Sequence, residues 1–204
     1  MKIKTVNNYM NDENTYIVCE GENALVIDPG NGTEEIMKEA KGANITHVLL
    51  THCHYDHIAY LKELVSLTGA DIVCSEKCAE NIKNPDVNLS LSGLGYKLSV
   101  KRADIIMGDG EEKNFSGLNV KCIHTPGHTN GGVCYLIGDS LFSGDTLFLR
   151  SVGRCDLPTG DYDELISSVR EKIYTLDPDT EVYPGHGNAT RVGYEKMYNL
   201  YVKG

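Results

Sequence analysis

Three histidines and one aspartate stand within six consecutive positions, from His52 to His57, and this cluster limits what the chain can fold into. In a strand, His52 and His54 would share one face, and a helix would line up none of the set well. A tight loop at the end of a strand allows all four side chains to turn inward. The apolar, β-branched run over residues 45–51 comes just before the cluster and indicates a buried strand. The sequence therefore predicts a metal-binding loop at the carboxyl end of a strand, where α/β sheets commonly carry their sites.

Three later segments each place one residue of a ligand type in a glycine-bearing loop after a predicted strand. These residues are His128, Asp145 and His186. With them, five of the seven histidines and two aspartates fall into one ordered set. Imidazole and carboxylate groups suit zinc and similar divalent metals, and loops held by strands can fix several of them together. The pattern therefore predicts metal binding.

The hydrophobic pattern alternates between strands and helices in two similar halves. Strands are predicted for residues 15–19, 24–28, 45–51, 71–74, 118–123, 133–137, 140–143 and 180–183, and helices for 33–41, 58–69, 162–175 and 190–201. The first of these helices is expected to have Thr33 as its cap. Residues 75–100 indicate short helical turns in a surface excursion beside the site. No linker-like gap separates the halves, so we expect one domain over residues 1–204, with two packed sheets covered by helices.

The composition limits which binding partners and which cellular compartment we expect. A formal net charge of -10 and a pI near 5.1 argue against general binding of nucleic acid or of an anionic membrane, because phosphate groups require a basic surface. No apolar run approaches the roughly 18–20 residues that span a bilayer, and residues 1–14 are polar, unlike a signal peptide. Seven cysteines without a C-x-x-C pair suit a reducing compartment. We therefore expect a cytoplasmic protein without a nucleic-acid or membrane partner.

The ordered set of ligand-type residues resembles the metallo-β-lactamase superfamily. The match consists of H-x-H-x-D-H at residues 52–57, followed by His128, Asp145 and His186, and it spans roughly residues 15–190. Within the superfamily the chain is most similar to the hydroxyacylglutathione hydrolases (glyoxalase II) and their short relatives, on the stretches 144–148, 153–158 and 184–187. The resemblance implies an α/β protein with the metallo-β-lactamase fold, an αββα sandwich of two mixed β-sheets flanked by helices.

The resemblance also implies a ligand set for two divalent metal ions per chain. His52, His54 and His128 would hold one ion. Asp56, His57 and His186 would hold the second ion, and Asp145 would bridge the two. Zinc is the expected metal, with iron or manganese as the alternatives.

The activity implied in this family is that of a dinuclear metal-dependent hydrolase, here a thioesterase. The substrate would be a small molecule, an S-(2-hydroxyacyl)glutathione-like thioester, attacked by a metal-bridging hydroxide. Asp56 would be the catalytic residue, because it holds its metal and orients the hydroxide. Two alternatives stay open: a mononuclear iron persulfide dioxygenase, which shares the fold, and a metal-stabilised binding module without catalysis.

Several residues near the motifs have two interpretations. His47 lies within a predicted strand and His124 lies outside the family pattern, so a structural or ligand-orienting role is favoured over ligation for both. Arg154 is either a salt-bridge partner of Asp156 or a clamp for an anionic substrate group. Asp28 is interpreted as a turn residue, with a hydrogen bond to the 52–57 loop as the functional alternative.

Overall fold

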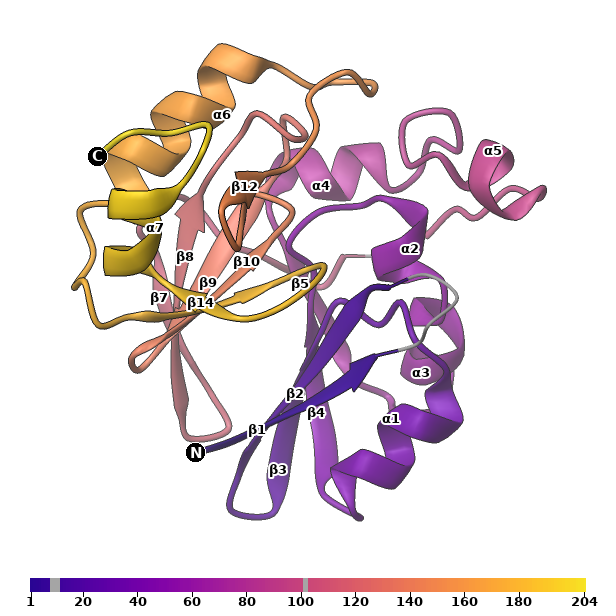
Figure 1. Ribbon diagram of the computed structural model, residues 1–204. Coiled ribbons are helices and arrows are strands. Elements are labelled where there is room, and N and C mark those ends of the chain that lie inside the picture. The colour runs from indigo at the N-terminus through magenta and orange to yellow at the C-terminus, as the bar shows by residue number, and fades with distance from the viewer. Residues whose placement is uncertain (8–11, 101–102) are drawn as a thin grey trace.

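The computed structural model describes residues 1–7, 12–100 and 103–204. Two six-stranded sheets pack face to face, and helices cover the outer face of each sheet (Figure 1). Four layers in the order helix, sheet, sheet, helix confirm the predicted αββα class.

The amino-terminal half forms the first sheet, in the strand order β1-β2-β3-β4-β5-β6. The strands are β1 (Lys2–Asn7), β2 (Asn14–Glu20), β3 (Asn23–Ile27), β4 (Asn44–Leu49), β5 (Asp71–Cys74) and β6 (Ile105–Ile106). The strands from β1 to β3 pair antiparallel, and those from β3 to β6 pair parallel. The parallel connections contain α1 (Thr33–Ala40), α2 (Tyr55–Ile58), α3 (Leu61–Thr68), α4 (Glu76–Asn81) and α5 (Ser90–Leu94). The carboxyl ends of β3, β4 and β5 therefore meet at one edge.

The carboxyl-terminal half forms the second sheet, in the order β14-β13-β10-β9-β8-β7. Its strands are β7 (Glu112–Phe115), β8 (Leu118–His124), β9 (Val133–Ile137), β10 (Ser140–Gly144), β13 (Glu181–Pro184) and β14 (Thr190–Arg191). A separate hairpin consists of β11 (Leu147–Phe148) and β12 (Ser151–Val152). The helices of this half are α6 (Tyr162–Ser168), the π-helical turn η1 (Val169–Ile173) and α7 (Val192–Tyr198). The sheet is mixed, because β10 and β13 pair parallel and the other strand pairs are antiparallel.

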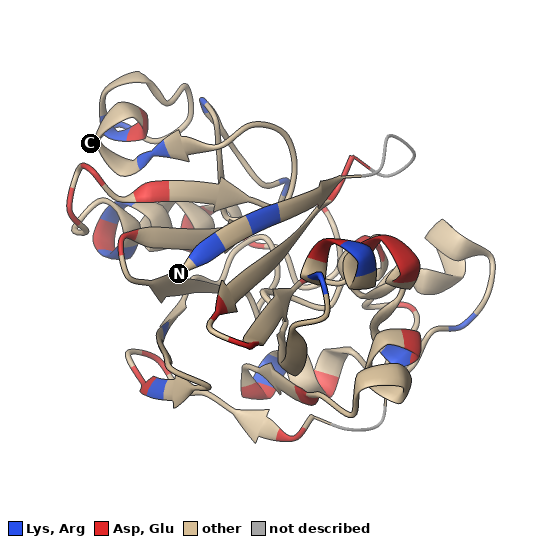
Figure 2. Ribbon diagram, turned by 90° about the horizontal axis from the view of Figure 1, so that it is seen from below, with Lys and Arg blue, Asp and Glu red and all other residues tan. Residues whose placement is uncertain are grey.

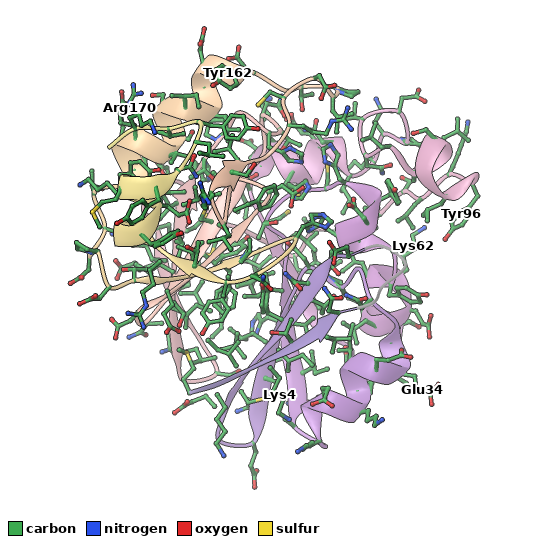
Figure 3. All side chains as sticks on the ribbon, in the orientation of Figure 1. Lys4, Glu34, Lys62, Tyr96, Tyr162 and Arg170 are labelled. Atoms are coloured by element: carbon green, nitrogen blue, oxygen red, sulfur yellow. The ribbon has the colours of Figure 1, made fainter. Side chains whose placement is uncertain are left out.

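Apolar side chains alternate between the two faces of the strands and build the core in separate layers. Val18 and Leu25 lie in the core between the sheets, together with Phe142 of the second sheet. Ile17 and Val26, their sequence neighbours, face the helices of the first half. Because both faces of these strands are covered, apolar residues stand side by side in their sequences, at positions 16–19 and 24–27. Figure 3 shows the outer surface of the helices, where the labelled Glu34, Lys62 and Arg170 point away from the layers.

Some elements differ from the sequence prediction. Gly32 is the N-cap of α1, with a non-helical backbone at φ -55° and ψ 138°, and Thr33 is the first helical residue. The helix predicted for residues 162–175 continues beyond α6 as a π-helical turn rather than an α-helix. Strand β1 was not predicted, because it is an edge strand in which Val6 alone is buried, and Figure 2 shows basic residues along it near the N-terminus. Within the described ranges, no helix has the length and apolarity that crossing a membrane requires.

Candidate metal centre

The predicted ligand residues gather at one end of the paired sheets. The 52–57 loop follows β4 and runs into α2, and His128 lies in the loop between β8 and β9. Asp145 follows β10 and His186 follows β13. These two strands are parallel neighbours with Gly144 opposite Pro184, so their next loops leave the sheet side by side.

The first group of ligand-type atoms belongs to His52, His54 and His128. One ring nitrogen from each lies within 4.8 Å of the others, and all three side chains are buried. His54 Nδ1 and His128 Nε2 are 2.9 Å apart. This is the same trio that the resemblance assigned to one metal, although its ligand role stays a prediction.

The second group consists of Asp56, His57 and His186, again with one ligand-type atom each within 4.8 Å of the others. Asp145 lies between the two groups. Its carboxylate is 3.3 Å from His57 Nε2, 3.7 Å from His186 Nε2 and 3.5 Å from His128 Nε2. The Asp145 carboxylate therefore contacts both groups, which is the position that a bridging ligand requires.

Unpaired buried atoms in the centre fit a divalent cation. His52 Nε2, His54 Nε2, His57 Nε2 and Asp145 Oδ1 are buried and have no hydrogen-bond partner among the described residues. A buried polar atom without a partner costs about 1–3 kcal/mol, so four in one place need an explanation. Imidazole nitrogen and carboxylate oxygen are donor types that divalent metals accept. Fold and donor set together indicate divalent-metal binding.

Burial keeps two histidines of the first group neutral, and neighbouring imidazoles keep Asp145 ionised. Burial holds the pKa of His52 well below its usual value, and burial lowers the pKa of His54 to about 3. Both imidazoles are therefore neutral at pH 7 and have a free lone pair. Burial alone would raise the pKa of the Asp145 carboxyl, but attraction to His57 and His128 holds it well below its usual value. Asp145 is therefore ionised.

Hydrogen bonds on the far side of the rings orient the histidines. His128 Nδ1 donates to the carbonyl of Arg154 at 2.7 Å, and His186 Nδ1 donates to the carbonyl of Asp12 at 2.9 Å. A carbonyl oxygen only accepts, so Nδ1 of each ring carries a proton and Nε2 is the nitrogen that faces the centre.

Asp28 accepts a hydrogen bond from the far side of the His57 ring and also binds the backbone directly before the 52–57 loop. Its backbone is left-handed, with φ 51°, as a turn requires. Its carboxylate accepts from Thr51 N at 2.8 Å, from Thr51 Oγ1 at 2.5 Å and from His57 Nδ1 at 3.0 Å. Thr51 Oγ1 in turn lies 3.1 Å from His52 Nδ1. Both interpretations of Asp28, the turn and the bond to the loop, therefore have a counterpart in the structure.

The two other histidines are occupied elsewhere. His47 Nδ1 is 2.9 Å from Thr46 Oγ1, and its ring packs on Phe115 with centroids 4.4 Å apart. His124 Nε2 is 3.0 Å from the carbonyl of Met107. Neither histidine joins a group of metal-ligand atoms in the part of the chain that the structure describes. These contacts agree with the structural roles that the sequence favoured.

Sequence reasoning missed the amino-terminal contribution to the centre. Glu13 is fully buried, accepts from Asn31 Nδ2 at 2.6 Å, and has its other oxygen 4.0 Å from His57 Nδ1. Burial raises the pKa of this carboxyl well above its usual value. No spacing singles out a glutamate in a short polar segment, and a backbone carbonyl such as that of Asp12 leaves no sequence signal at all.

Gly185 explains how the loop before His186 fits. A Cβ atom at this position would lie 2.4 Å from Asp145 Oδ1 and 2.6 Å from His57 Cε1. No side chain fits in that space, so only glycine allows the backbone to approach the ligand groups this closely.

A cavity of about 410 Å³ opens beside the centre. Its lining includes ligand-type residues of both groups and five others, namely Tyr55, Leu89, Phe148, Arg154 and Leu157. The Arg154 guanidinium donates to both carboxylate oxygens of Asp156, at 2.6 and 2.7 Å. Arg154 therefore has the predicted salt bridge and also lines the cavity.

The layered sheets, the two ligand groups and the adjoining cavity define a class of protein, the αββα metalloproteins with a His/Asp centre at one end of the sandwich. Residues 10–186 match the family model of the metallo-beta-lactamase superfamily, and the chain belongs to this superfamily.

Curated relatives and solved structures agree with this assignment. A Streptococcus pyogenes protein named "Probable metallo-hydrolase" is 35% identical and covers 98% of this chain and 89% of its own. The hydroxyacylglutathione hydrolase GloC of Haemophilus influenzae is 33% identical and covers 93% of this chain and 92% of its own. The crystal structure of BLEG-1 B3 metallo-beta-lactamase has a TM-score of 0.93 at 29% identity and covers 100% of both chains. The crystal structure of TTHA1623 in a di-iron-bound form has a TM-score of 0.85 at 30% identity and covers 98% of this chain and 100% of its own.

Proposed function

We propose that this protein is a dinuclear metal-dependent hydrolase that cleaves thioesters of the S-(2-hydroxyacyl)glutathione type. The observation that carries the proposal is the pair of ligand groups with Asp145 between them, open to a cavity on one side. A relative named hydroxyacylglutathione hydrolase supports the substrate class.

The proposed ligand roles follow the two groups. His52, His54 and His128 hold one ion, and Asp56, His57 and His186 hold the other, with Asp145 as the bridge. Zinc is the metal we propose, and the di-iron form of TTHA1623 keeps iron as a candidate. When bound, divalent ions supply a Lewis acid for the thioester carbonyl and lower the pKa of a coordinated water to about 7.

Asp56 is the protein group that would orient the attacking water. Its carboxylate lines the cavity, and its Oδ2 lies 3.4 Å from His186 Nε2. Burial would raise the pKa of Asp56, but the hydrogen bond with His186 and attraction to His57 lower it. The carboxylate is therefore ionised and can accept a hydrogen bond from the attacking water. The departing thiol has an ordinary pKa of about 8.5, so it leaves as a thiolate without a strong acid.

The test is thiol release from S-D-lactoylglutathione by protein loaded with zinc, iron or manganese, with metal content measured on the same samples. We expect saturable turnover and two ions per chain. Asp56→Ala should lose one ion and at least about 100-fold in kcat/KM, because it removes a ligand and the orienting carboxylate. Asp163→Ala, at an exposed position on α6, is the matched control and should change neither value.

Two results would contradict the proposal. Full activity in both Asp56→Ala and Asp145→Ala would remove these residues from the reaction. One iron per chain, with oxygen uptake on a glutathione persulfide and no thioester cleavage, would favour the persulfide dioxygenase instead.

A further inference from the structure

The cavity beside the metal centre has an apolar wall. Tyr55, Leu89, Phe148 and Leu157 line it and are half-buried, so their side chains border both the protein and the open space. Tyr55 and Leu89 belong to the α2 and α5 region, and Phe148 and Leu157 belong to β11 and the loop after β12. Figure 1 shows these two regions on opposite sides of the same end of the sandwich.

The arginine on the cavity wall is already paired with a carboxylate. Among the described residues that line it, Arg154 alone has a guanidinium or ammonium group. That guanidinium is held by both oxygens of Asp156, at 2.6 and 2.7 Å. A carboxylate on the substrate, away from the metal centre, would therefore have to compete with Asp156 for the same donors.

Leu89 has an unusual backbone for its residue type. Its φ of 61° and ψ of 12° are left-handed, a conformation that costs a residue with a Cβ about 1–2 kcal/mol. The neighbouring bonds maintain this conformation: Asn88 Nδ2 donates to the carbonyl of Leu98 at 2.8 Å, Ser90 N donates to Asn88 Oδ1 at 3.0 Å, and Gly93 N donates to the carbonyl of Leu89 at 2.8 Å. Such strain in a well-supported position is characteristic of functional sites.

The segment that carries Leu89 is tied directly to the ligand loop. Tyr55 stands between two ligand-type residues, and its backbone N–H donates to the carbonyl of Asn88 at 2.8 Å. Its ring packs on the backbone of Gly93, where a Cβ atom would lie 2.3 Å from the ring. Leu89 is therefore held at a fixed position relative to the metal centre.

We infer that Leu89, Phe148 and Leu157 form a subsite for an uncharged hydrocarbon group of the substrate, and that Leu89 sets the size of that group. The inference rests on the proposed thioesterase function for the bond that is cleaved. The inference adds a substrate preference to the proposed function. Thioesters with an apolar group in the subsite should react better than thioesters with a carboxylate there. The hydrocarbon group belongs either to the acyl part or to the thiol, and the test separates the two.

The test uses the full chain with its metals bound and two series of thioesters. The acyl series consists of the acetyl, butyryl, hexanoyl and succinyl thioesters of N-acetylcysteamine. The thiol series consists of the acetyl thioesters of hexanethiol and of 3-mercaptopropionate. We expect kcat/KM to rise by up to about fourfold for each methylene buried in one of the series. The carboxylate-bearing member of that series should be at least about tenfold poorer than its uncharged counterpart.

Substitutions at Leu89 should change selectivity without changing metal content. Leu89→Ala should lower kcat/KM for butyryl by about tenfold and shift the preference toward longer chains, because the wall recedes. Leu89→Lys should raise the succinyl-to-butyryl ratio by about tenfold or more, because it supplies an unpaired cation. Leu91→Ala is the matched control, because Leu91 is exposed in α5, two residues after Leu89, and does not line the cavity.

Leu157→Lys repeats the charge test from the opposite wall, in case the strained position of Leu89 does not tolerate lysine. The inference is overturned if butyryl and succinyl thioesters react equally and neither lysine variant changes their ratio. If the metal-loaded protein cleaves no thioester, the proposed function fails, and the subsite is then tested by calorimetric binding. Tighter binding of the S-hexyl than of the S-carboxypentyl thioether of N-acetylcysteamine would support the subsite, and equal binding would overturn it.

Discussion

At the residue scale, four histidines of the centre have a hydrogen-bond partner on the ring nitrogen opposite the one that faces the centre, namely His52, His57, His128 and His186. Asp28 is the clearest case, because three donors converge on its carboxylate, from Thr51 N, Thr51 Oγ1 and His57 Nδ1. A carboxylate accepts all three, and an amide does not. The Asp28 carboxylate therefore keeps a proton on His57 Nδ1 and leaves Nε2 as the nitrogen that faces the centre.

Replacing Asp28 by Asn should weaken metal binding at the group that contains His57. Asn tolerates the left-handed backbone, with φ 51°, so the turn is kept. Its NH₂ group would face either Thr51, whose two donors it cannot accept, or His57, whose proton would then move to Nε2 and block the lone pair. We expect affinity for one of the two ions to fall about 10–100-fold, measured by competition with a chromophoric chelator. Asp179→Asn, at an exposed position, should leave both affinities unchanged; equal affinities in Asp28→Asn would refute this role.

At the element scale, a buried glutamate anchors α7 to the β11–β12 hairpin, which contributes Phe148 to the cavity. Glu195 is fully buried, and its Oε2 accepts from Arg150 N and Asn199 Nδ2, each at 2.8 Å. Its Oε1 accepts from Thr190 Oγ1 at 2.6 Å. One side chain therefore joins the turn between β11 and β12, strand β14 and the carboxyl-terminal cap of α7.

Replacing Glu195 by Ala should lower the free energy of unfolding by about 2–4 kcal/mol, because three donors, among them the buried Asn199 amide, lose their acceptor. Urea denaturation of the metal-loaded protein measures this loss. Met197→Ala removes an exposed side chain on the same helix and should stay within about 0.5 kcal/mol of the wild type. A loss below about 1 kcal/mol for Glu195→Ala would mean that the anchor contributes little.

At the scale of the whole molecule, the two sheets share one core. Val18 and Leu25 of the first sheet pack in the same buried cluster as Tyr135 and Phe142 of the second. Neither half can keep its inner face buried without the other. Figure 2 shows acidic and basic residues distributed over both halves, and the absence of a nucleic-acid partner remains a prediction from the acidic composition. The cytoplasmic location also remains a prediction.

The shared core predicts that the chain unfolds in one cooperative step, as a single domain would. Metal should stabilise this domain, because the unfolded chain does not hold the ligand groups together. At free metal concentrations about a thousandfold above Kd, we expect the melting temperature to be roughly 10 °C higher than after chelation. Calorimetry with and without a chelator measures both features. Two separate transitions would contradict the single domain, and an unchanged melting temperature would contradict metal binding by the folded state.

The strands buried on both faces were predictable, and the edges were not. Residues 45–51 form a continuous apolar run, and β4 is found there. Strand β1 alternates lysine with apolar residues at a sheet edge, and the two-residue strands β11 and β14 are too short to show any period. These elements depend on partners across the sheet rather than on their own sequence.

The sequence by itself determined which residue types are present in the ordered set from His52 to His186, because H-x-H-x-D-H and the three glycine-bearing loops are local patterns. It also determined the strands that carry those loops, through their apolar runs. Only the tertiary structure decided which groups meet. Asp145 lies between His57 and His128, and Leu89 lines the cavity beside them. Both positions depend on sheet pairing and loop packing between segments far apart in the chain. Contacts over such separations are determined by the register and packing of the whole core, which no local pattern specifies.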